Sequence, residues 1–359
     1  MRIVTVVGAR PQFVKASVIS RLLRARPGVR EVLIHTGQHY DSNMSEVFFR
    51  ELAIPKPDYH LGVGSLSHGK QTGAMLGALE DLLLNEVPDW VIVLGDTNST
   101  LAGALAASKL HIPVAHVEAG LRSFNMRMPE EINRVLTDHV SSLLFAPTEQ
   151  AARNLAAEGI SGLSVKRTGD IMLDVSLHYA AVAEAQSTIL RRLELQPASY
   201  VLATVHRQEN TDDPVRLATI CQGLMEVCKR HPVVLPLHPR TKKCVAALGL
   251  KLDGPDLHLV DPVSYLDMIA LERSALVVAT DSGGVQKEAY FFRVPCVTLR
   301  EETEWVELVS TGWNRLASLR SSETVAEAIL SAVGTQGASE SLYGDGKTAE
   351  TIVAELMSR

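Results

Sequence analysis

Short apolar runs rich in β-branched residues alternate along the chain with longer stretches in which apolar residues recur at helical spacing. In the first half, the runs predict strands at residues 3–7, 32–35, 91–94, 114–117 and 143–146. The stretches between and after them predict helices at residues 12–25, 69–85, 100–110, 129–140 and 149–158. Continuous apolar strands separated by amphipathic helices indicate βαβ units and a parallel sheet with helices on both faces.

The second half repeats this alternation. It predicts strands at residues 200–205, 233–237, 257–260, 276–279 and 296–298, and helices at residues 214–229, 265–272, 285–292, 306–309, 324–332 and 348–357. A less regular stretch at residues 169–197 separates the halves, and 359 residues exceed what one core usually serves. We therefore predict an α/β fold of two Rossmann-like, doubly wound domains facing a cleft, where such folds bind ligands.

Composition narrows the classes of function. The net charge of −6 provides no global basic field, so we do not expect nucleic acid as a partner. No apolar run approaches the roughly 18 residues that span a bilayer, and the N-terminal run is too short for a secretory signal, so we expect no membrane association. The four cysteines form no CxxC pair and are expected to be free thiols of a cytoplasmic protein.

The turn after the first predicted strand carries two cations. Gly8 permits a tight turn, and Pro11 suits the first turn of a helix. Arg10 and Lys15 would then lie near the positive end of that helix, where phosphate binds favourably. The turn lacks the GxGxxG spacing of dinucleotide-binding folds. The alternative is an ordinary strand-to-helix turn with solvated cations.

Carboxylates follow two further strands and open one helix in the first half. Asp96 and Glu118 each come directly after an apolar run, at the cleft edge of the predicted sheet. Asp96 taken alone is better explained as a helix N-cap. Glu130 and Glu131 fall in a first helical turn, where one of the pair is expected only to complement the helix dipole. Three converging carboxylates would supply acid and base to both faces of a sugar.

Two strand ends in the second half carry histidine together with arginine. His206 and Arg207 follow one strand, and His238 and Arg240 follow another. A single histidine in such a place is usually structural. Two strand ends that both carry histidine and arginine indicate a diphosphate site.

A small-residue turn follows the strand at residues 276–279. Ser282, Gly283 and Gly284 lead into the next helix, and such a turn forms a phosphate cradle of backbone N–H groups. Glu288 lies about one turn later and would accept hydrogen bonds from ribose hydroxyls.

His35 and His39 have the four-residue spacing of a zinc site. They follow a strand, however, and Gly37 lies between them, so the helical face that such a site needs is missing. We expect no metal.

These segments, taken in order, resemble the non-hydrolysing UDP-N-acetylglucosamine 2-epimerase family. The resemblance runs through GARPQFVK, HTGQHYD, GDTNSTLAG, HVEAGLR, PEEINR, HRQEN, DSGGVQKEA and YGDGKTAE. It implies a GT-B-like fold in which the last helix packs on the first domain, so that the domains comprise residues 1–168 plus 341–359 and residues 169–340. It also implies a homodimer, a UDP-linked amino sugar as ligand and no cofactor, because UDP itself leaves and returns.

The family resemblance implies roles for individual residues. In the chemistry proposed for the family, a base takes the C2 proton as UDP leaves C1, and the resulting 2-acetamidoglycal is reprotonated on the opposite face. By position, Asp96, Glu118 and Glu130 match the acid and base carboxylates, and His206 matches the cleft histidine. The positions that match UDP contacts are Arg10, Lys15, Ser282, Gly283 and Glu288.

Several positions depart from the common pattern and bear on the substrate. Trp305 stands where many members carry Arg, Val263 and Met268 replace common residues of the uridine wall, and Asp41 replaces a Gln of regulated members. The segments SFNMRMPEEINR, DPVSYLDM and TEWVELV resemble most the branch that acts on UDP-2,3-diacetamido-2,3-dideoxy-glucuronate for surface polysaccharide synthesis. A uronate needs an added cation, which Arg122 or Arg127 would supply. The alternatives are a UDP-N-acetylglucosamine 2-epimerase, a GT-B glycosyltransferase, a hydrolysing relative and a UDP-sugar sensor.

Overall fold

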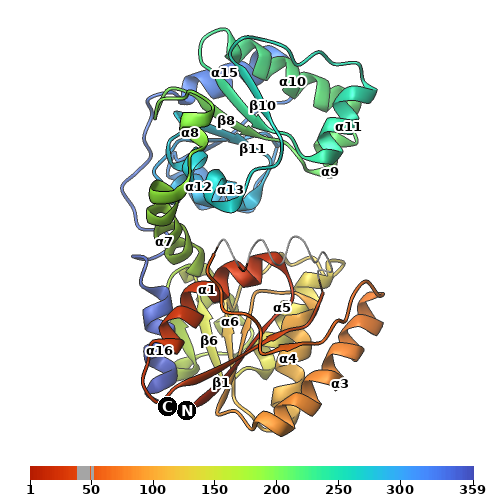
Figure 1. Cartoon of the computed structure of the whole chain (residues 1–359), viewed down its shortest axis with the longest axis vertical. Helices are drawn as coiled ribbons and strands as arrows, with labels where there is room; N and C mark the ends of the chain where they lie inside the picture. Colours follow the sequence, from red (N-terminus) through yellow and green to blue (C-terminus); the bar gives the residue numbers. More distant parts are fainter. Residues whose placement is uncertain (39–48, 50–51) are drawn as a thin grey trace. The chain divides into compact units, whose positions relative to one another are not determined.

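The computed structural model describes residues 1–38, 49 and 52–359 (Figure 1). The chain divides into a first unit, Met1–Val175 with Ser341–Arg359, and a second unit, Ser176–Glu340. The division falls inside helix α7 (Ile171–Gln186), a few residues beyond the boundary placed at residues 168 and 169 from the sequence. Helix α7 was not predicted, because apolar residues are spread around all sides of it and leave no helical period.

The first unit is built on a seven-stranded parallel sheet with the order β3-β2-β1-β4-β5-β6-β7. Its strands are β1 (Arg2–Val7), β2 (Arg30–His35), β3 (Tyr59–His60), β4 (Trp90–Leu94), β5 (Val114–Val117), β6 (Leu143–Ala146) and β7 (Val165–Arg167). The strand order reverses between β1 and β4. This reversal is the place where open α/β sheets bind ligands, beyond the carboxyl ends of the strands.

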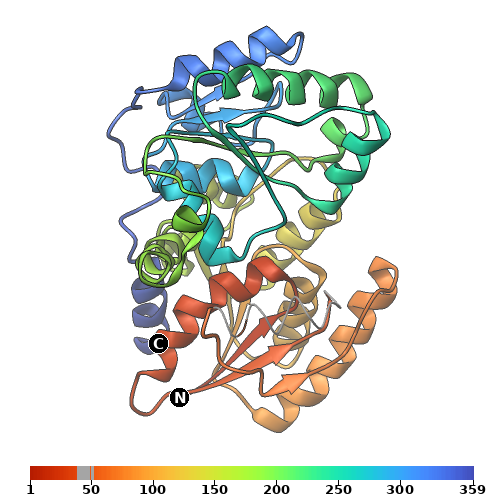
Figure 2. The ribbon, with the colours of Figure 1, turned by 45° about the horizontal axis from the view of Figure 1, so that its top comes forward.

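Helices cover both faces of this sheet (Figures 1 and 2). They are α1 (Arg10–Arg24), α3 (His68–Glu86), α4 (Asn98–Lys109), α5 (Pro129–Val140), α6 (Glu149–Ala157) and α16 (Thr348–Met357), with a 3-10 turn at Gly162–Ser164. Alternate strand residues such as Val4 and Val6 pack with Met75 and Leu79 of α3 and with the alanines of α4. Helix α16 packs against α1, as the family resemblance implied.

The second unit contains a six-stranded parallel sheet with the order β10-β9-β8-β11-β12-β13. Its strands are β8 (Val201–Thr204), β9 (Val233–Pro236), β10 (Leu257–Val260), β11 (Val277–Thr280), β12 (Cys296–Thr298) and β13 (Asn314–Leu316). Its other helices are α8 (Ile189–Arg192), α9 (Gln208–Thr211), α10 (Pro214–Cys228), α11 (Pro239–Ala247), α12 (Tyr265–Arg273), α13 (Gly283–Phe291), α14 (Val306–Ser310) and α15 (Ser322–Ala332). The order repeats that of the first six strands of the first sheet, so the reversal lies between β8 and β11.

Residue alternation along β8 explains the layers of the second unit. Val201 and Ala203 join a core with α10 and α15, which lie side by side in Figures 1 and 2. Leu202 joins the opposite core, to which Leu271 of α12 and Ala289 of α13 contribute. Both faces of the strand are therefore buried, as expected for a continuous apolar run in a parallel sheet.

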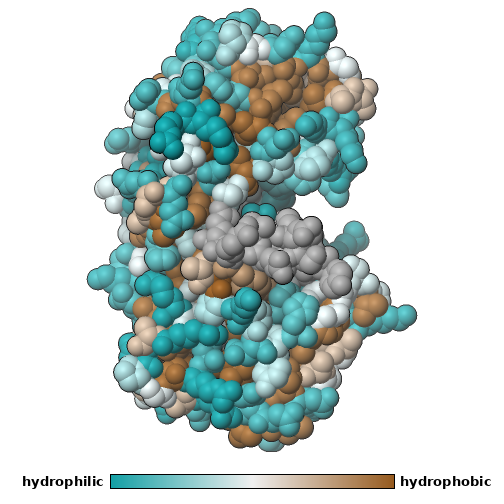
Figure 3. All heavy atoms as spheres, viewed as in Figure 1, coloured by the Kyte–Doolittle hydropathy of each residue, from teal (hydrophilic) through white to brown (hydrophobic). Residues whose placement is uncertain are grey.

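The predicted fold class, two Rossmann-like parallel α/β units, is confirmed. The elements that the sequence did not predict include β3, β7 and β13, which are too short to show a pattern. The predicted cleft between the domains concerns their placement relative to one another and stays a prediction. Figure 3 shows a largely hydrophilic face with hydrophobic patches, and no helix among the described residues has the length and hydropathy of a membrane span.

Candidate active site

The residues singled out in the sequence follow strands that border the two reversals. In the first sheet, Val6 pairs with Val93 and Leu94 pairs with Val117, so the segments after β1, β4 and β5 leave the sheet at one edge. In the second sheet, Thr204 pairs with Thr280, which brings the segments after β8 and β11 together. Each unit therefore has a cluster of polar residues at its ligand-binding edge.

Glu118 and Lys15 form an ion pair at the edge of the first sheet. The side chain of Glu118 is 7% exposed and that of Lys15 is 13% exposed, so the pair is largely shielded from water. Gly95 lies against the pair, since a Cβ atom there would be 3.5 Å from Glu118 Oε2 and 3.6 Å from Lys15 Nζ. Lys15, predicted to contact UDP, is in the structure the counter-ion of a carboxylate.

The backbone of Glu118 is held in an unfavourable conformation. Its φ angle is 70°, in the left-handed region that non-glycine residues rarely adopt, at a cost of about 1–3 kcal/mol. The hydrogen bond from Ala119 N to Phe145 O, 3.1 Å long, fixes the peptide that follows. Strain of this kind is concentrated at functional sites, where it directs a side chain.

Asp96 pairs with Arg134 of α5, with 2.6 Å between Oδ2 and Nη2. Its side chain remains 30% exposed. The interpretation of Asp96 as a helix N-cap is wrong, because the hydroxyl of Thr97 caps α4 by accepting a hydrogen bond from Thr100 N. The Asp96 carboxylate is therefore not used in starting the helix and stays accessible at the sheet edge.

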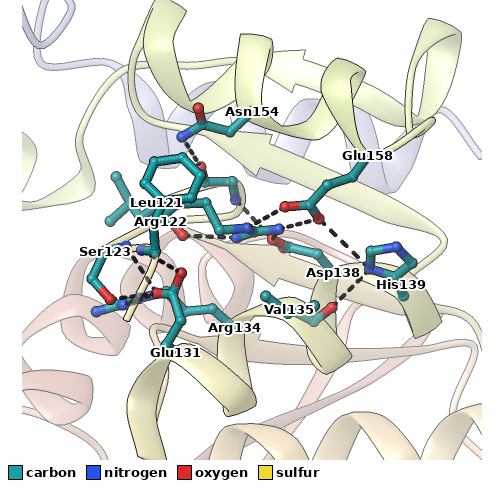
Figure 4. Close-up of polar contacts among 12 residues, drawn as sticks. Leu121, Arg122, Ser123, Glu131, Arg134, Val135, Asp138, His139, Asn154 and Glu158 are labelled. Atoms are coloured by element: carbon teal, nitrogen blue, oxygen red, sulfur yellow. Dashed lines mark hydrogen bonds and ion pairs between the residues drawn. The ribbon is translucent and has the colours of Figure 1, made fainter. Parts of the chain in front are cut away.

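The two adjacent acids at the start of α5 have different environments, and Figure 4 shows that of Glu131. Glu131 is 1% exposed and accepts hydrogen bonds from Ser123 N, Ser123 Oγ and Phe124 N, each 2.9 Å long. Burial raises the pKa of Glu131, but these hydrogen bonds and Arg134 outweigh it and hold the pKa below its ordinary value. Glu131 is the structural member of the pair, while Glu130 is exposed.

Arg122 is enclosed within the first unit. Its side chain is 1% exposed, and its guanidinium binds Glu158 at 2.6 Å and Asp138 at 2.8 Å (Figure 4). A cation held by two carboxylates is not available to a ligand in this structure, so Arg122 is not one of the proposed binding residues. Arg127, the other predicted cation, is exposed in the segment between Arg122 and α5.

His116 connects this network to the loop that carries Asp96. His116 is fully buried, with Nδ1 2.7 Å from Asp138 Oδ1 and Nε2 2.8 Å from the carbonyl oxygen of Gly95. The carboxylate and the carbonyl oxygen are both hydrogen-bond acceptors. Burial raises the pKa of Asp138, but the charges of His116 and Arg122 outweigh this and lower it. Asp138 was not predicted as a site residue. The sequence indicates its role only by placing an acid on the inner face of α5.

In the second unit, Asp281 holds the segment that carries His206. Its fully buried carboxylate accepts hydrogen bonds from His206 N and Arg207 N, both at 3.0 Å, and from Asn210 Nδ2 at 3.0 Å. The His206 side chain is 44% exposed, and its ring centroid lies 6.4 Å from that of His238. Asp281 is the first residue of the segment DSGGVQKEA, but no role was predicted for it from the sequence. It is the residue that joins the two strand ends.

The predicted arginines of the second unit lie beside acids. Arg207 Nη2 is 3.6 Å from Glu304 Oε1, and Arg240 pairs with Asp212. Each arginine side chain is more than a third exposed. Nδ1 of His238 accepts a hydrogen bond from Arg240 N and caps α11, so this imidazole has a structural role at least.

Two helix N-termini lie at the ligand-binding edges. Helix α13 begins at Gly283, followed by Gly284, and within the described part of the chain the Ser282 side chain forms no capping hydrogen bond. Its first N–H groups are therefore placed to receive an anion. Helix α1 begins at the exposed Arg10. Glu288 lies on α13 and is partly buried.

The structure describes only His35 of the two histidines that have the spacing of a zinc site. His35 is 2% exposed, and its Nδ1 accepts a hydrogen bond from Gly37 N at 2.8 Å. His39 and Asp41 lie outside the described residues. In the part of the chain that the structure covers, no group of three potential metal ligands is found.

Comparison with known proteins decides the family. The model of the UDP-N-acetylglucosamine 2-epimerase family matches residues 21–357. The UDP-2,3-diacetamido-2,3-dideoxy-D-glucuronate 2-epimerase of Pseudomonas aeruginosa is 52% identical, with all of both chains covered. This chain belongs to the UDP-N-acetylglucosamine 2-epimerase family. The predicted family membership is thereby confirmed.

Solved structures of other members support the same assignment. The UDP-GlcNAc 2-epimerase of Methanocaldococcus jannaschii, in complex with UDP-GlcNAc and UDP, is 43% identical, with a TM-score of 0.84 over all of both chains. The enzyme of Neisseria meningitidis bound to UDP-GlcNAc is 31% identical, with a TM-score of 0.85 and the same coverage.

Proposed function

We propose that this protein is an isomerase that inverts C2 of a UDP-linked 2-acetamido sugar. The proposed substrate is UDP-2,3-diacetamido-2,3-dideoxy-glucuronate, and the product is its manno epimer for surface polysaccharide synthesis. The relative with 52% identity is a UDP-2,3-diacetamido-2,3-dideoxy-D-glucuronate 2-epimerase, which supports this choice of substrate. The observation that carries the chemistry is the strained Glu118, whose carboxylate is held by Lys15 at the sheet edge where Asp96 also emerges.

The reaction proceeds by elimination and re-addition of UDP. A carboxylate takes the C2 proton while the C1–O bond breaks, its electron pair leaves with UDP, and a C1–C2 double bond forms. A second acid then delivers a proton to the opposite face of C2, and UDP re-adds at C1. Asp96, Glu118 and Glu130 are the proposed acids and bases, because general acid–base transfer requires positioned carboxylates.

The second unit binds the nucleotide and stabilises the leaving group in this proposal. The uncapped N-terminus of α13, at Ser282, Gly283 and Gly284, receives the diphosphate, and Glu288 accepts the ribose hydroxyls. His206 and Arg207 follow β8, and His238 and Arg240 follow β9, where the positive charge of the two arginines offsets the charge that develops on UDP. Arg10, at the start of α1, supplies a further cation.

Arg127 is the proposed partner of the uronate carboxylate. It is exposed, it lies three residues before Glu130, and Glu131 fixes the backbone of the segment that carries it. Arg122 cannot take this role while Asp138 and Glu158 hold it.

The test is to incubate the enzyme with UDP-2,3-diacetamido-2,3-dideoxy-glucuronate and with UDP-N-acetylglucosamine side by side and to follow C2 by NMR. We expect inversion of C2 in the uronate at the higher kcat/KM. Faster inversion of UDP-N-acetylglucosamine would select the alternative substrate. Sugar transfer to an acceptor, or release of free sugar without inversion, would contradict the epimerase function.

We also propose that this protein is cytoplasmic and forms a homodimer. The cysteines are free thiols, and burial raises the pKa of Cys221 to about 12 and that of Cys228 to about 11. Buried free thiols suit a reducing compartment. Light scattering of the purified protein tests the dimer.

A further inference from the structure

Trp305 lies directly against the start of the proposed phosphate cradle. Its indole N–H donates a 2.8 Å hydrogen bond to the carbonyl oxygen of Gly283, the first residue of α13. The segment between β12 and α14 carries this tryptophan and is anchored by Arg300, which pairs with Glu209 at 2.6 Å.

Further contacts fix the orientation of the indole ring. The Lys287 ammonium lies 4.5 Å from the centroid of the Trp305 ring, in cation–π geometry, and Lys287 is itself only 7% exposed. Trp305 N donates to the hydroxyl of Thr303, which donates in turn to Gln286 Oε1 at 2.6 Å. Gln286 and Lys287 both belong to α13, so the tryptophan is bound to the same helix through its backbone and its ring.

Gly283 and Gly284 have no Cβ atom, so steric contacts restrict the peptide between them less than they restrict a peptide between other residues. The carbonyl of Gly283 and the N–H of Gly284 belong to one planar peptide unit. A hydrogen bond that holds the carbonyl therefore also fixes the direction of the N–H, which points the opposite way in the same plane. That N–H is among the first donors of α13, which find no partner inside the helix.

We propose that Trp305 is a positioning residue that orients the Gly283–Gly284 peptide so that its N–H points to the diphosphate of the substrate. This inference rests on the proposed function, in which α13 holds UDP. It assigns a role to the tryptophan that stands where many family members carry arginine. Trp305 acts through the peptide and need not touch the ligand.

The test compares Trp305→Phe with Trp313→Phe in the full-length protein. Trp305→Phe keeps the aromatic ring over Lys287 but loses the N–H donor. Trp313 is the matched control, because its indole donates a 2.8 Å hydrogen bond to Ala338 O in the same unit. Its ring contacts α13 at Tyr290, near the C-terminal end of the helix and not at the Gly283–Gly284 peptide. Calorimetry measures the binding of UDP and of uridine, which lacks phosphate, to each variant, and thermal unfolding shows that both are folded.

We expect Trp305→Phe to weaken UDP binding about three- to tenfold, the effect of losing one hydrogen bond, and to leave uridine binding unchanged. Trp313→Phe should lower the unfolding temperature without changing the affinity for either ligand. Equal losses for UDP and uridine, or no loss for UDP in Trp305→Phe, would overturn the inference. Failure of the wild-type protein to bind UDP would instead contradict the proposed function itself.

Discussion

Lys15 of α1 and Glu118 after β5 form an ion pair although 103 residues separate them in the sequence. Lys15→Met leaves a buried carboxylate without its counter-charge, so we expect kcat to fall at least about tenfold. The control is Lys166→Met, which removes a more exposed 3.0 Å pair with Glu355 in the same unit. Steady-state kinetics and thermal unfolding of both variants test this. Equal activity of the two would show that the Lys15 pair serves only the fold.

Glu130 and Glu131 are adjacent, but replacing them with Gln should affect different properties. The change at Glu130 should reduce turnover, and the change at Glu131 should reduce stability. Glu130→Gln should reduce turnover at least about a hundredfold without changing stability, because its carboxylate is exposed and is proposed to transfer a proton. Glu131→Gln should cost about 2–4 kcal/mol of unfolding free energy at neutral pH, since it weakens charge-assisted hydrogen bonds and the Arg134 pair. This stability difference should vanish as pH falls through the lowered pKa of Glu131. Denaturation with urea at several pH values, together with kinetics, checks both expectations. Stability losses from both variants would contradict the division of roles.

Glu272 in α12 is fully buried, and neither of its carboxyl oxygens has a hydrogen-bond partner among the described residues. Burial, with a further contribution from the charge of Glu288, raises its pKa well above the ordinary value. As pH rises above about 4.3, the unfolded chain loses this proton while the folded chain keeps it, so stability falls by about 1.4 kcal/mol per pH unit until the folded pKa is reached.

Glu272→Met should therefore raise the unfolding temperature, and by more at about pH 8 than at about pH 5. We expect a gain of at least about 3 °C at the higher pH. Glu272→Gln is the control, since its amide remains buried and should give a smaller gain. Calorimetric scans across this pH range measure the effect. A gain that does not depend on pH would show that Glu272 is charged in the folded protein.

Arg127 should decide between uronate and neutral sugars. Arg127→Gln removes the proposed partner of the C6 carboxylate, so we expect kcat/KM for the uronate to fall about tenfold to a hundredfold. The ratio of kcat/KM for the uronate to that for UDP-N-acetylglucosamine should fall with it. Arg153→Gln, at an exposed position of α6, is the control and should leave this ratio unchanged. An unchanged ratio in Arg127→Gln would show that Arg127 does not bind the C6 carboxylate.

Hydrophobic patterns alone placed most of the strands correctly and, with them, the strand-end positions of Asp96, Glu118 and His206. They predicted α5 with its observed bounds, because Pro129 starts the helix and its apolar spacing is regular. Side-chain partners were not predictable in the same way. The contacts of Lys15 with Glu118 and of Arg122 with Asp138 depend on how distant segments pack, and no local pattern encodes such distances. The N-cap interpretation of Asp96 taken alone was wrong, because Thr97, one residue later, is the N-cap.

In the proposed reaction, carboxylates of the first unit remove and return the C2 proton of a UDP-sugar. The most direct measurement is NMR of the UDP-sugar after incubation with the enzyme in heavy water. We expect deuterium at C2 of both recovered substrate and product with the wild-type protein. We expect no exchange with Glu118→Gln or Asp96→Asn, although both variants still bind UDP. Inversion without deuterium at C2, or unaltered exchange in both variants, would contradict the claim.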